Sequence, residues 1–120
     1  APENEIRAIA VARLAGSVTV KLDMQKALSA IPASFGIASP ARIVIDLPRT
    51  ANALGRNSQS FNEGGLRSAN FVHTPEKLRL VLNLTESMTH EMRSEGNSLM
   101  VVLTPVKAAG STGENEVVRF

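Results

Sequence analysis

Residues 77–84 read Lys-Leu-Arg-Leu-Val-Leu-Asn-Leu, with a leucine at every second position. This alternation predicts a β-strand buried on one face, because successive side chains of a strand point to opposite faces. The leucines form the inward row. The outward row consists of Lys77, Arg79, Val81 and Asn83, and Val81 is its one apolar member.

The same alternation occurs sixty positions earlier, in residues 18–24, and the similarity continues along the chain. Residues 6–8 (Ile-Arg-Ala) correspond to residues 66–68 (Leu-Arg-Ser) at the same offset. Further on the offset becomes fifty-six, and residues 43–47 correspond to residues 99–103. A duplicated supersecondary unit explains this repeat, and such a duplication places any surface motif twice.

A break in the alternation precedes each of these two strands. In the first repeat the apolar residues Ile6, Ile9 and Val11 slip by one position, and the second repeat slips at the matching place. An extra residue that shifts the phase of a strand is typical of a β-bulge. Because the slip occurs in both repeats, we expect a bulge in the first strand of each.

Each repeat contains two further segments with a strand pattern. Third strands are expected at residues 33–38 and 88–95, and fourth strands at residues 42–47 and 98–103. Eight short strands in two groups predict an all-β fold, a β-sandwich of two four-stranded sheets built from two similar repeats. The predicted aliphatic core includes Val20, Leu22, Ile45, Leu80, Leu82 and Val101.

The predicted organisation is one domain, residues 1–104, because a chain of 120 residues is long enough to bury one core. Repeat one spans residues 5–47 and repeat two spans residues 66–104. Residues 105–120 are rich in Ala, Gly, Ser, Thr and Glu, a composition typical of a linker.

The connector between the repeats, residues 48–65, is polar and is expected to contain no strand. It is either a functional loop or a connection with a short helical turn around residues 51–54. Leu54 is expected to pack against the core. Gly64 and Gly65 would give the chain the freedom to re-enter the sheet.

Composition excludes several classes of function. The hydrophobic fraction of 43% excludes a disordered chain, and a net charge of +2 is too small for nonspecific binding of nucleic acid. The absence of cysteine excludes disulfides, a thiol nucleophile and a thiolate metal site. No stretch approaches the roughly 18 to 20 apolar residues of a membrane helix, so direct membrane insertion is not expected.

The sequence contains no recognisable catalytic motif for a serine hydrolase, a zinc protease or a phosphate-binding loop. Asp23 and Asp46 could flank a glycosidic bond in principle, but solvated strand residues are the favoured interpretation. His73 and His90 lack the further ligands that a metal site needs. We therefore expect no enzyme, no cofactor and no metal.

The outward rows of the first two strands in each repeat carry basic residues: Arg7, Arg13 and Lys21, then Arg67, His73, Lys77 and Arg79. Strands joined in a hairpin are neighbours, so these charges would gather on a sheet face. Guanidinium groups bind carboxylates and phosphates through two parallel hydrogen bonds. The two interpretations are a face that binds an anionic ligand and an ordinary solubilising surface.

Residues 50–56 (Thr-Ala-Asn-Ala-Leu-Gly-Arg), 62–68 (Asn-Glu-Gly-Gly-Leu-Arg-Ser) and 78–84 resemble the AMIN domain of type IV pilus secretins. Residues 41–47 resemble the fourth strand of that family, and the resemblance covers roughly residues 3–104. It implies a sandwich of two four-stranded sheets. It also implies a non-catalytic, periplasmic module at the N-terminus of a ring-forming outer-membrane secretin, which it anchors to peptidoglycan.

The family's motifs lie on the outer sheet faces, which implies a peptidoglycan site among Arg7, Lys21, Arg67, Arg79 and Asn83. Sugar-binding surfaces usually stack rings on Trp or Tyr, and the chain contains neither. Hydrogen bonds to the glycan and cation contacts to stem-peptide carboxylates are the expected interactions. The resemblance also implies other pilus-assembly proteins as partners. The alternative is a structural module that docks such a partner, or a neighbouring secretin domain, through a sheet edge or face.

Overall fold

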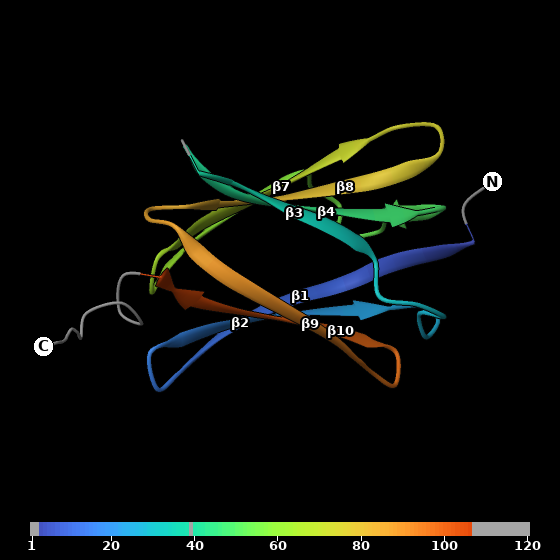
Figure 1. Cartoon of the computed structure of the whole chain (residues 1–120). Helices are drawn as coiled ribbons and strands as arrows, with labels where there is room; N and C mark the ends of the chain where they lie inside the picture. The colour runs from blue at the N-terminus through green and yellow to red at the C-terminus, as the bar shows by residue number, and fades with distance from the viewer. Residues whose placement is uncertain (1–2, 39, 107–120) are drawn as a thin grey trace, which may run out of the picture.

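A computed structural model of the protein describes residues 3–38 and 40–106, which form two β-sheets packed face to face (Figure 1). Sheet A has the strand order β5-β1-β2-β10-β9, and sheet B has the order β3-β4-β8-β7-β6. The strands are β1 (Asn4–Leu14), β2 (Ser17–Met24), β3 (Ala33–Ala38), β4 (Ala41–Pro48), β5 (Thr50–Asn52), β6 (Ser58–Glu63), β7 (Leu66–His73), β8 (Lys77–Leu84), β9 (Met88–Glu95) and β10 (Ser98–Pro105). The all-β sandwich is confirmed, with five strands in each sheet rather than the four expected.

The additional strands, β5 and β6, both come from the connector, so the expectation that residues 48–65 contain no strand is wrong. β5 pairs in parallel with β1, and β6 pairs antiparallel with β7 through residues 58–60. Both are edge strands, with one face on the core and the other in solvent, so a polar sequence can form them. Thr50 is buried in β5, and Phe61 of β6 packs against the core.

Between β5 and β6 the chain turns back around the side chain of Asn52, and no helical turn forms at residues 51–54. The Asn52 side-chain oxygen accepts a hydrogen bond from the Leu54 N–H (2.9 Å), and its amide nitrogen donates to the Arg56 carbonyl (2.7 Å). Leu54 packs against the core, as expected. This segment therefore has a structural role.

The two repeats exchange strands. Repeat one contributes the hairpin β1-β2 to sheet A and the pair β3-β4 to sheet B, whereas repeat two contributes β7-β8 to sheet B and β9-β10 to sheet A. The central pairs, β2 with β10 and β4 with β8, each join one repeat to the other. In this arrangement β1, β2, β3 and β4 correspond to β7, β8, β9 and β10.

Both predicted bulges are present. The register of β1 against β2 shifts between Ile6 and Ala8, and that of β7 against β8 shifts between Leu66 and Ser68. The additional residue is an arginine in each repeat, Arg7 or Arg67. A bulge allows the residue before it to point inward even though the alternation is broken, and both Ile6 and Leu66 are fully buried.

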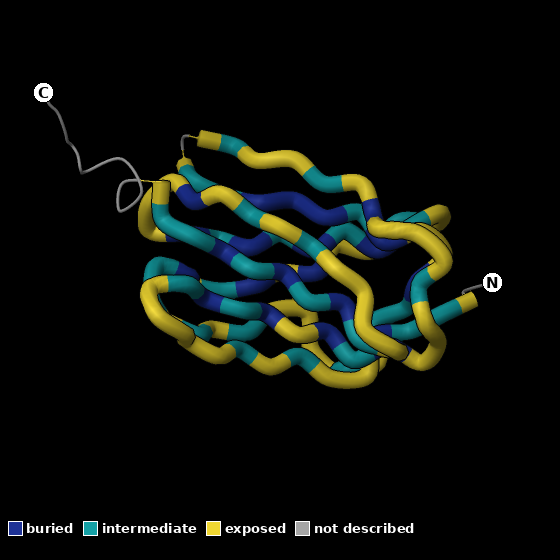
Figure 2. The backbone as a smooth tube through the Cα atoms, turned by 60° about the horizontal axis from the view of Figure 1, so that its bottom comes forward, coloured by how far each residue is buried: buried dark blue, intermediate teal, exposed yellow. Residues whose placement is uncertain are grey.

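The core lies between the sheets and is aliphatic. All six predicted core residues, Val20, Leu22, Ile45, Leu80, Leu82 and Val101, have no exposed surface. Figure 2 shows buried positions alternating with exposed or intermediate positions along the central strands, as half-buried strands require. At an open side of the sandwich, Ser34 Oγ of β3 and His90 Nε2 of β9 form a 2.8 Å hydrogen bond between the sheets.

The predicted linker begins inside a strand. Pro105 is the last residue of β10 and pairs with Met88 of β9, and the N–H of Val106 donates to the Ser87 carbonyl (3.2 Å). The rest of the predicted linker lies outside the described residues. The described residues contain no helix long and apolar enough to cross a membrane.

Candidate functional site on the outer face of sheet B

The five residues predicted to bind peptidoglycan lie on both outer faces and do not form one site. Arg7 and Lys21 belong to sheet A, whereas Arg67, Arg79 and Asn83 belong to sheet B. Arg67 and Arg79 occupy adjacent strands but opposite ends of them, because Arg67 lies at the bulge beside Asn83 and Arg79 lies four residues away along β8. At about 3.3 Å per residue, this separation is roughly 13 Å.

The guanidinium of Arg79 is bound to a carboxylate. Its Nε and Nη2 donate to the two oxygens of Asp46 (2.8 and 3.2 Å), and Lys77 Nζ donates to Asp46 Oδ2 (3.1 Å). Hydrogen bonds from Arg79, and then from Lys77, hold the pKa of Asp46 below its usual value, although burial opposes them. The guanidinium carbon also lies 5.9 Å from the ring centre of Phe35. These contacts give Arg79 a structural role.

The cations of sheet A have acidic neighbours. Arg7 Nε donates to Glu5 Oε2 (3.0 Å), and Lys21 Nζ lies 3.9 Å from Asp23 Oδ1. Asp23 also accepts a 2.8 Å hydrogen bond from the hydroxyl of Ser98. This part of sheet A is therefore balanced in charge.

Asn83, on the outer face of β8, is the centre of a polar cluster. Its amide nitrogen donates to Ser68 Oγ (3.1 Å) and to Asn70 Oδ1 (2.6 Å), both on β7. With both amide protons used, the side-chain oxygen of Asn83 has a fixed orientation. Among the described residues this oxygen has no side-chain donor, so it remains an acceptor for a ligand.

Two arginines flank Asn83 from the neighbouring strands. Arg42 of β4 lies directly opposite Asn83, and at the bulge Arg67 and Ser68 of β7 together oppose it from the other side. Within residues 3–38 and 40–106, neither arginine forms an ion pair. The carboxylate of Glu86 lies near Gly65 but pairs with neither of them. We call Arg42, Arg67, Ser68, Asn70 and Asn83 the Asn83 cluster.

The other repeat carries different chemistry at the same place in the fold. Asp23 stands where the second repeat has Asn83, and Glu5 stands where it has Gly65. Ser98, which pairs with Asp23, corresponds to Arg42. The bulge arginine is common to both sites. The site around Asn83 thus lacks the two carboxylates of the site around Asp23 and has an additional arginine, Arg42 from repeat one, so two positive charges flank a neutral amide.

Arg42 was not among the predicted site residues, because it lies outside the outward rows of the first two strands of each repeat. The alternation of residues 42–47 does place Arg42 outward, since Ile43 and Ile45 are buried. The sequence does not indicate that Arg42 lies beside Asn83, because the pairing of β4 with β8 joins different repeats. The register also shows which residue of repeat two corresponds to Lys21. Lys21 pairs with Ala10, and Val81 pairs with Asn70, sixty positions after Ala10, so Lys21 corresponds to Val81.

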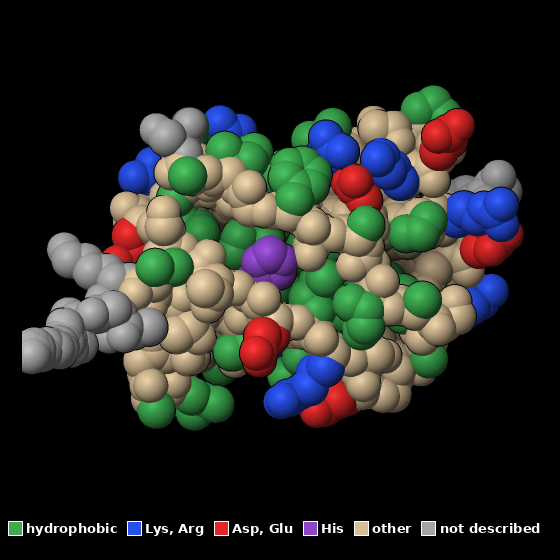
Figure 3. All heavy atoms as spheres, viewed as in Figure 1, with side chains coloured by type: hydrophobic (Ala, Val, Ile, Leu, Met, Phe, Trp, Pro, Cys, Tyr) green, Lys and Arg blue, Asp and Glu red, His purple; other side chains and the backbone are tan. Residues whose placement is uncertain are grey.

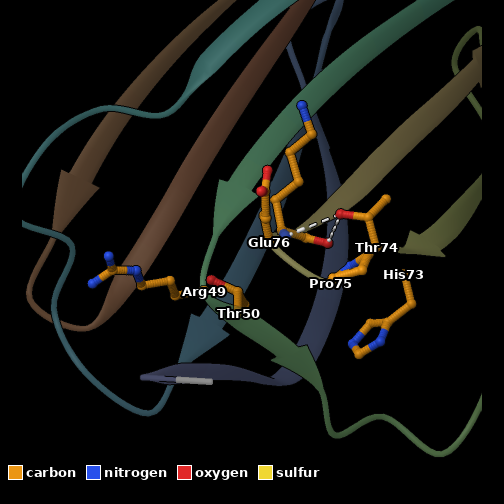
Figure 4. Close-up of a pocket in the computed structure, with 7 residues that line it drawn as sticks. Arg49, Thr50, His73, Thr74, Pro75 and Glu76 are labelled. Carbon is orange, nitrogen blue, oxygen red and sulfur yellow. Dashed lines mark hydrogen bonds between the residues drawn. The ribbon is translucent and has the colours of Figure 1, made fainter. Parts of the chain in front are cut away.

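The polar side chains beside the β7–β8 turn do not converge on one another. A hollow of about 710 Å³ beside the β7–β8 turn is lined by Arg49, His73 and Glu76, among others (Figure 4). Its Arg49 and His73 side chains point in different directions. Thr74 uses its hydroxyl to close the turn, accepting from the Lys77 N–H and donating to the Lys77 carbonyl. No group of three metal-ligating side chains occurs in the part of the chain that the structure describes.

Comparisons with known proteins identify the family of the chain. Residues 5–103 match the AMIN domain. A protein of Pseudomonas aeruginosa (strain PAO1), named fimbrial assembly protein PilQ, is 35% identical over 108 residues. The match covers 89% of this chain but 15% of that relative, so the chain spans a small part of the relative's length. On the family match and this identity, the chain belongs to the AMIN domain family.

Proposed function

We propose that this domain is a non-catalytic peptidoglycan-binding module that anchors a type IV pilus outer-membrane secretin to the cell wall from the periplasm. Membership of the AMIN family and similarity to a fimbrial assembly protein support the setting. In this proposal the full-length protein forms a homo-oligomeric ring, and other pilus-assembly proteins are its neighbours.

The Asn83 cluster is the observation that carries the proposal. Arg42 and Arg67 lie on either side of Asn83 without a carboxylate partner among the described residues, which suits a ligand with carboxylates and amides. Peptidoglycan offers both, through the stem peptides and the acetamido groups of its sugars. Of the five residues predicted from sequence, Arg67 and Asn83 therefore carry the site. Arg7, Lys21 and Arg79 have no direct part in the proposed site, because carboxylates already engage them.

Affinity at a single site should be weak. Each charge-assisted hydrogen bond contributes about 1.5–3 kcal/mol, and the face has no Trp or Tyr on which a sugar could stack. Many copies around a ring would raise the avidity, provided that the wall geometry allows them to bind together.

The test is co-sedimentation of the purified domain with insoluble peptidoglycan sacculi. The double variant Arg42→Ala/Arg67→Ala should bind at least about tenfold more weakly, since a factor of ten corresponds to about 1.4 kcal/mol. Binding by the wild type should also fall as salt rises, because exposed charges are screened. Thermal stability should change by no more than about 0.5 kcal/mol.

The matched control is Arg7→Ala/Lys21→Ala, which removes the same charge from the outer face of sheet A. It should sediment like the wild type. Equal loss in both double variants would show that net charge, and not the Asn83 cluster, drives binding. No sedimentation of the wild type at low salt would exclude peptidoglycan as the ligand.

A second candidate function, docking of a pilus-assembly partner or a neighbouring secretin domain, is favoured by an apolar row on the same outer face. Val81 pairs with Val44, and Val44 pairs with Phe35. Phe35 is 46% exposed and Val72 nearby on β7 is 49% exposed, whereas Val44, between Phe35 and Val81, is covered and only 4% exposed. Of this row, only Val81 was apparent from the sequence as an outward apolar residue.

A further inference from the structure

The edge strand β3 lacks the protection that edge strands usually carry. An edge exposes unpaired backbone groups, and native proteins discourage pairing there with charges, bulges or short strands. β5 has three residues, β6 has an irregular register and Glu63, and β9 carries Glu91, Arg93 and Glu95. β3, by contrast, pairs with β4 in continuous register over six residues and contains no charged residue.

Comparison with β9, its counterpart in the other repeat, shows how far β3 departs. Phe35 of β3 lies opposite Val44, and Arg93 of β9 lies opposite Met100. Met100 is the counterpart of Val44, fifty-six positions later, so Arg93 is the counterpart of Phe35. By the same register, the outward residues of β3 (Ala33, Phe35, Ile37) correspond to those of β9 (Glu91, Arg93, Glu95). Figure 3 looks onto this side of the molecule, with charged side chains over β9 and hydrophobic ones along β3. One position in the fold therefore has opposite edge chemistry in the two repeats.

We infer that β3 is a self-association edge, at which two copies of this chain pair antiparallel and join two sheets B into one continuous sheet. Antiparallel pairing about a two-fold axis through Phe35 places Phe35 opposite its symmetry mate and Ala33 opposite Ile37. No like charges face each other across this seam, because β3 has no charge.

A second copy fits this edge better than an arbitrary strand, because the rows of the two sheets match. Phe35, Val44 and Val81 pair with one another across β3, β4 and β8 and form an apolar row. When the two-fold axis passes through Phe35, this row of one copy continues into the same row of the other. It also places Ala33 and Asp46 of one copy in line with Ile37 and Arg42 of the other, so acidic and basic positions share a row. The seam borders the Asn83 cluster at Arg42, which pairs with Ile37, but the inference does not depend on peptidoglycan binding.

Sedimentation equilibrium across micromolar to millimolar concentrations tests the pairing. A six-residue seam is small, so association is weak and the mean mass should rise from 12.8 kDa toward twice that value only at high concentration. The variant Phe35→Arg/Ile37→Glu gives β3 the side chains of β9 and should remain monomeric, with an unchanged circular dichroism spectrum. The matched control Arg93→Glu/Glu95→Arg on β9 should associate like the wild type.

A wild type that stays monomeric throughout overturns the inference, as does a β3 variant that associates equally well. The register has its own test, because the chain has no cysteine. The variant Ala33→Cys/Ile37→Cys should oxidise to a covalent dimer, since residues 33 and 37 of two copies lie opposite each other within disulfide reach. Each single-cysteine variant should cross-link at least about tenfold more slowly. Equal cross-linking by a single variant contradicts this register.

Discussion

Asp46 and Asp23 are both outward carboxylates on central strands, yet their surroundings differ. The side chain of Asp46 is 18% exposed and receives three hydrogen bonds from Arg79 and Lys77. The side chain of Asp23 is 46% exposed and receives one hydrogen bond, from Ser98. Because partly buried, charge-assisted hydrogen bonds are stronger than exposed ones, the two carboxylates should differ in their contribution to stability.

We predict that Asp46→Ala lowers the free energy of unfolding by about 1–2 kcal/mol, near the low end for charged hydrogen bonds because Arg79 and Lys77 are partly exposed. The effect should depend on pH. The folded pKa of Asp46 lies below the unfolded value of about 3.9, so the stabilisation is present above that value and disappears as pH falls through the folded pKa.

Urea unfolding at pH 7 and in acid measures both effects, with Asp23→Ala as the control. Asp23→Ala should cost no more than about 0.5 kcal/mol at pH 7. A difference between wild type and Asp46→Ala that is the same at pH 7 and at pH 2 would contradict the electrostatic explanation.

At the scale of single elements, alternation predicted the long strands and their cores well because an apolar row needs a sheet to bury it. Residues 77–84 form β8 with the predicted bounds, and both bulges follow from a phase slip visible in the sequence. The connector was predicted as a loop because β5 and β6 bury few apolar side chains. Short edge strands form because their backbone hydrogen-bonds to a neighbouring strand, and the side-chain pattern of the sequence does not reveal this pairing.

Gly64, in the turn from β6 to β7, illustrates how tightly that connection meets the opposite sheet. Its φ is +52°, and a Cβ there would lie 2.7 Å from Cγ2 of Val18, which is buried in sheet A. We predict that Gly64→Ala costs about 2–4 kcal/mol, from left-handed backbone strain and from displacement of the core. Denaturant unfolding measures the cost.

The control for Gly64 is Gly55→Ala, which has the same backbone problem (φ +83°) but no atom within 4 Å of the new Cβ. It should cost only about 1–2 kcal/mol, the price of the backbone conformation alone. Equal costs for the two variants would mean that the contact with Val18 is relieved without strain.

At the scale of the whole molecule, the candidate site is a consequence of strand exchange. Arg67 and Asn83 lie in repeat two, but Arg42 comes from repeat one and meets them only because β4 pairs with β8. The repeat was visible in the sequence and so was the outward direction of each residue. The partner of each central strand was not, since alternation specifies a face and leaves the neighbouring strand open. This explains why only Arg67 and Asn83, two of the five residues of the cluster, could be predicted from the sequence.

Strand exchange also means that neither repeat should fold as a monomer. A fragment of residues 1–56 keeps the strands β5-β1-β2 and the pair β3-β4, but both central pairings to repeat two are lost. Each half-sheet would end at a central strand that has lost its partner, and its apolar inner face would be uncovered because the strands that pack on it belong to the other repeat. We predict that fragments 1–56 and 57–120 each lack a dispersed amide NMR spectrum as monomers, and that mixing them restores one. Each fragment needs a partner in order to fold. Because the repeats are similar, this partner is either the complementary fragment or a second copy of the same fragment. A fragment that is both folded and monomeric would contradict the exchange.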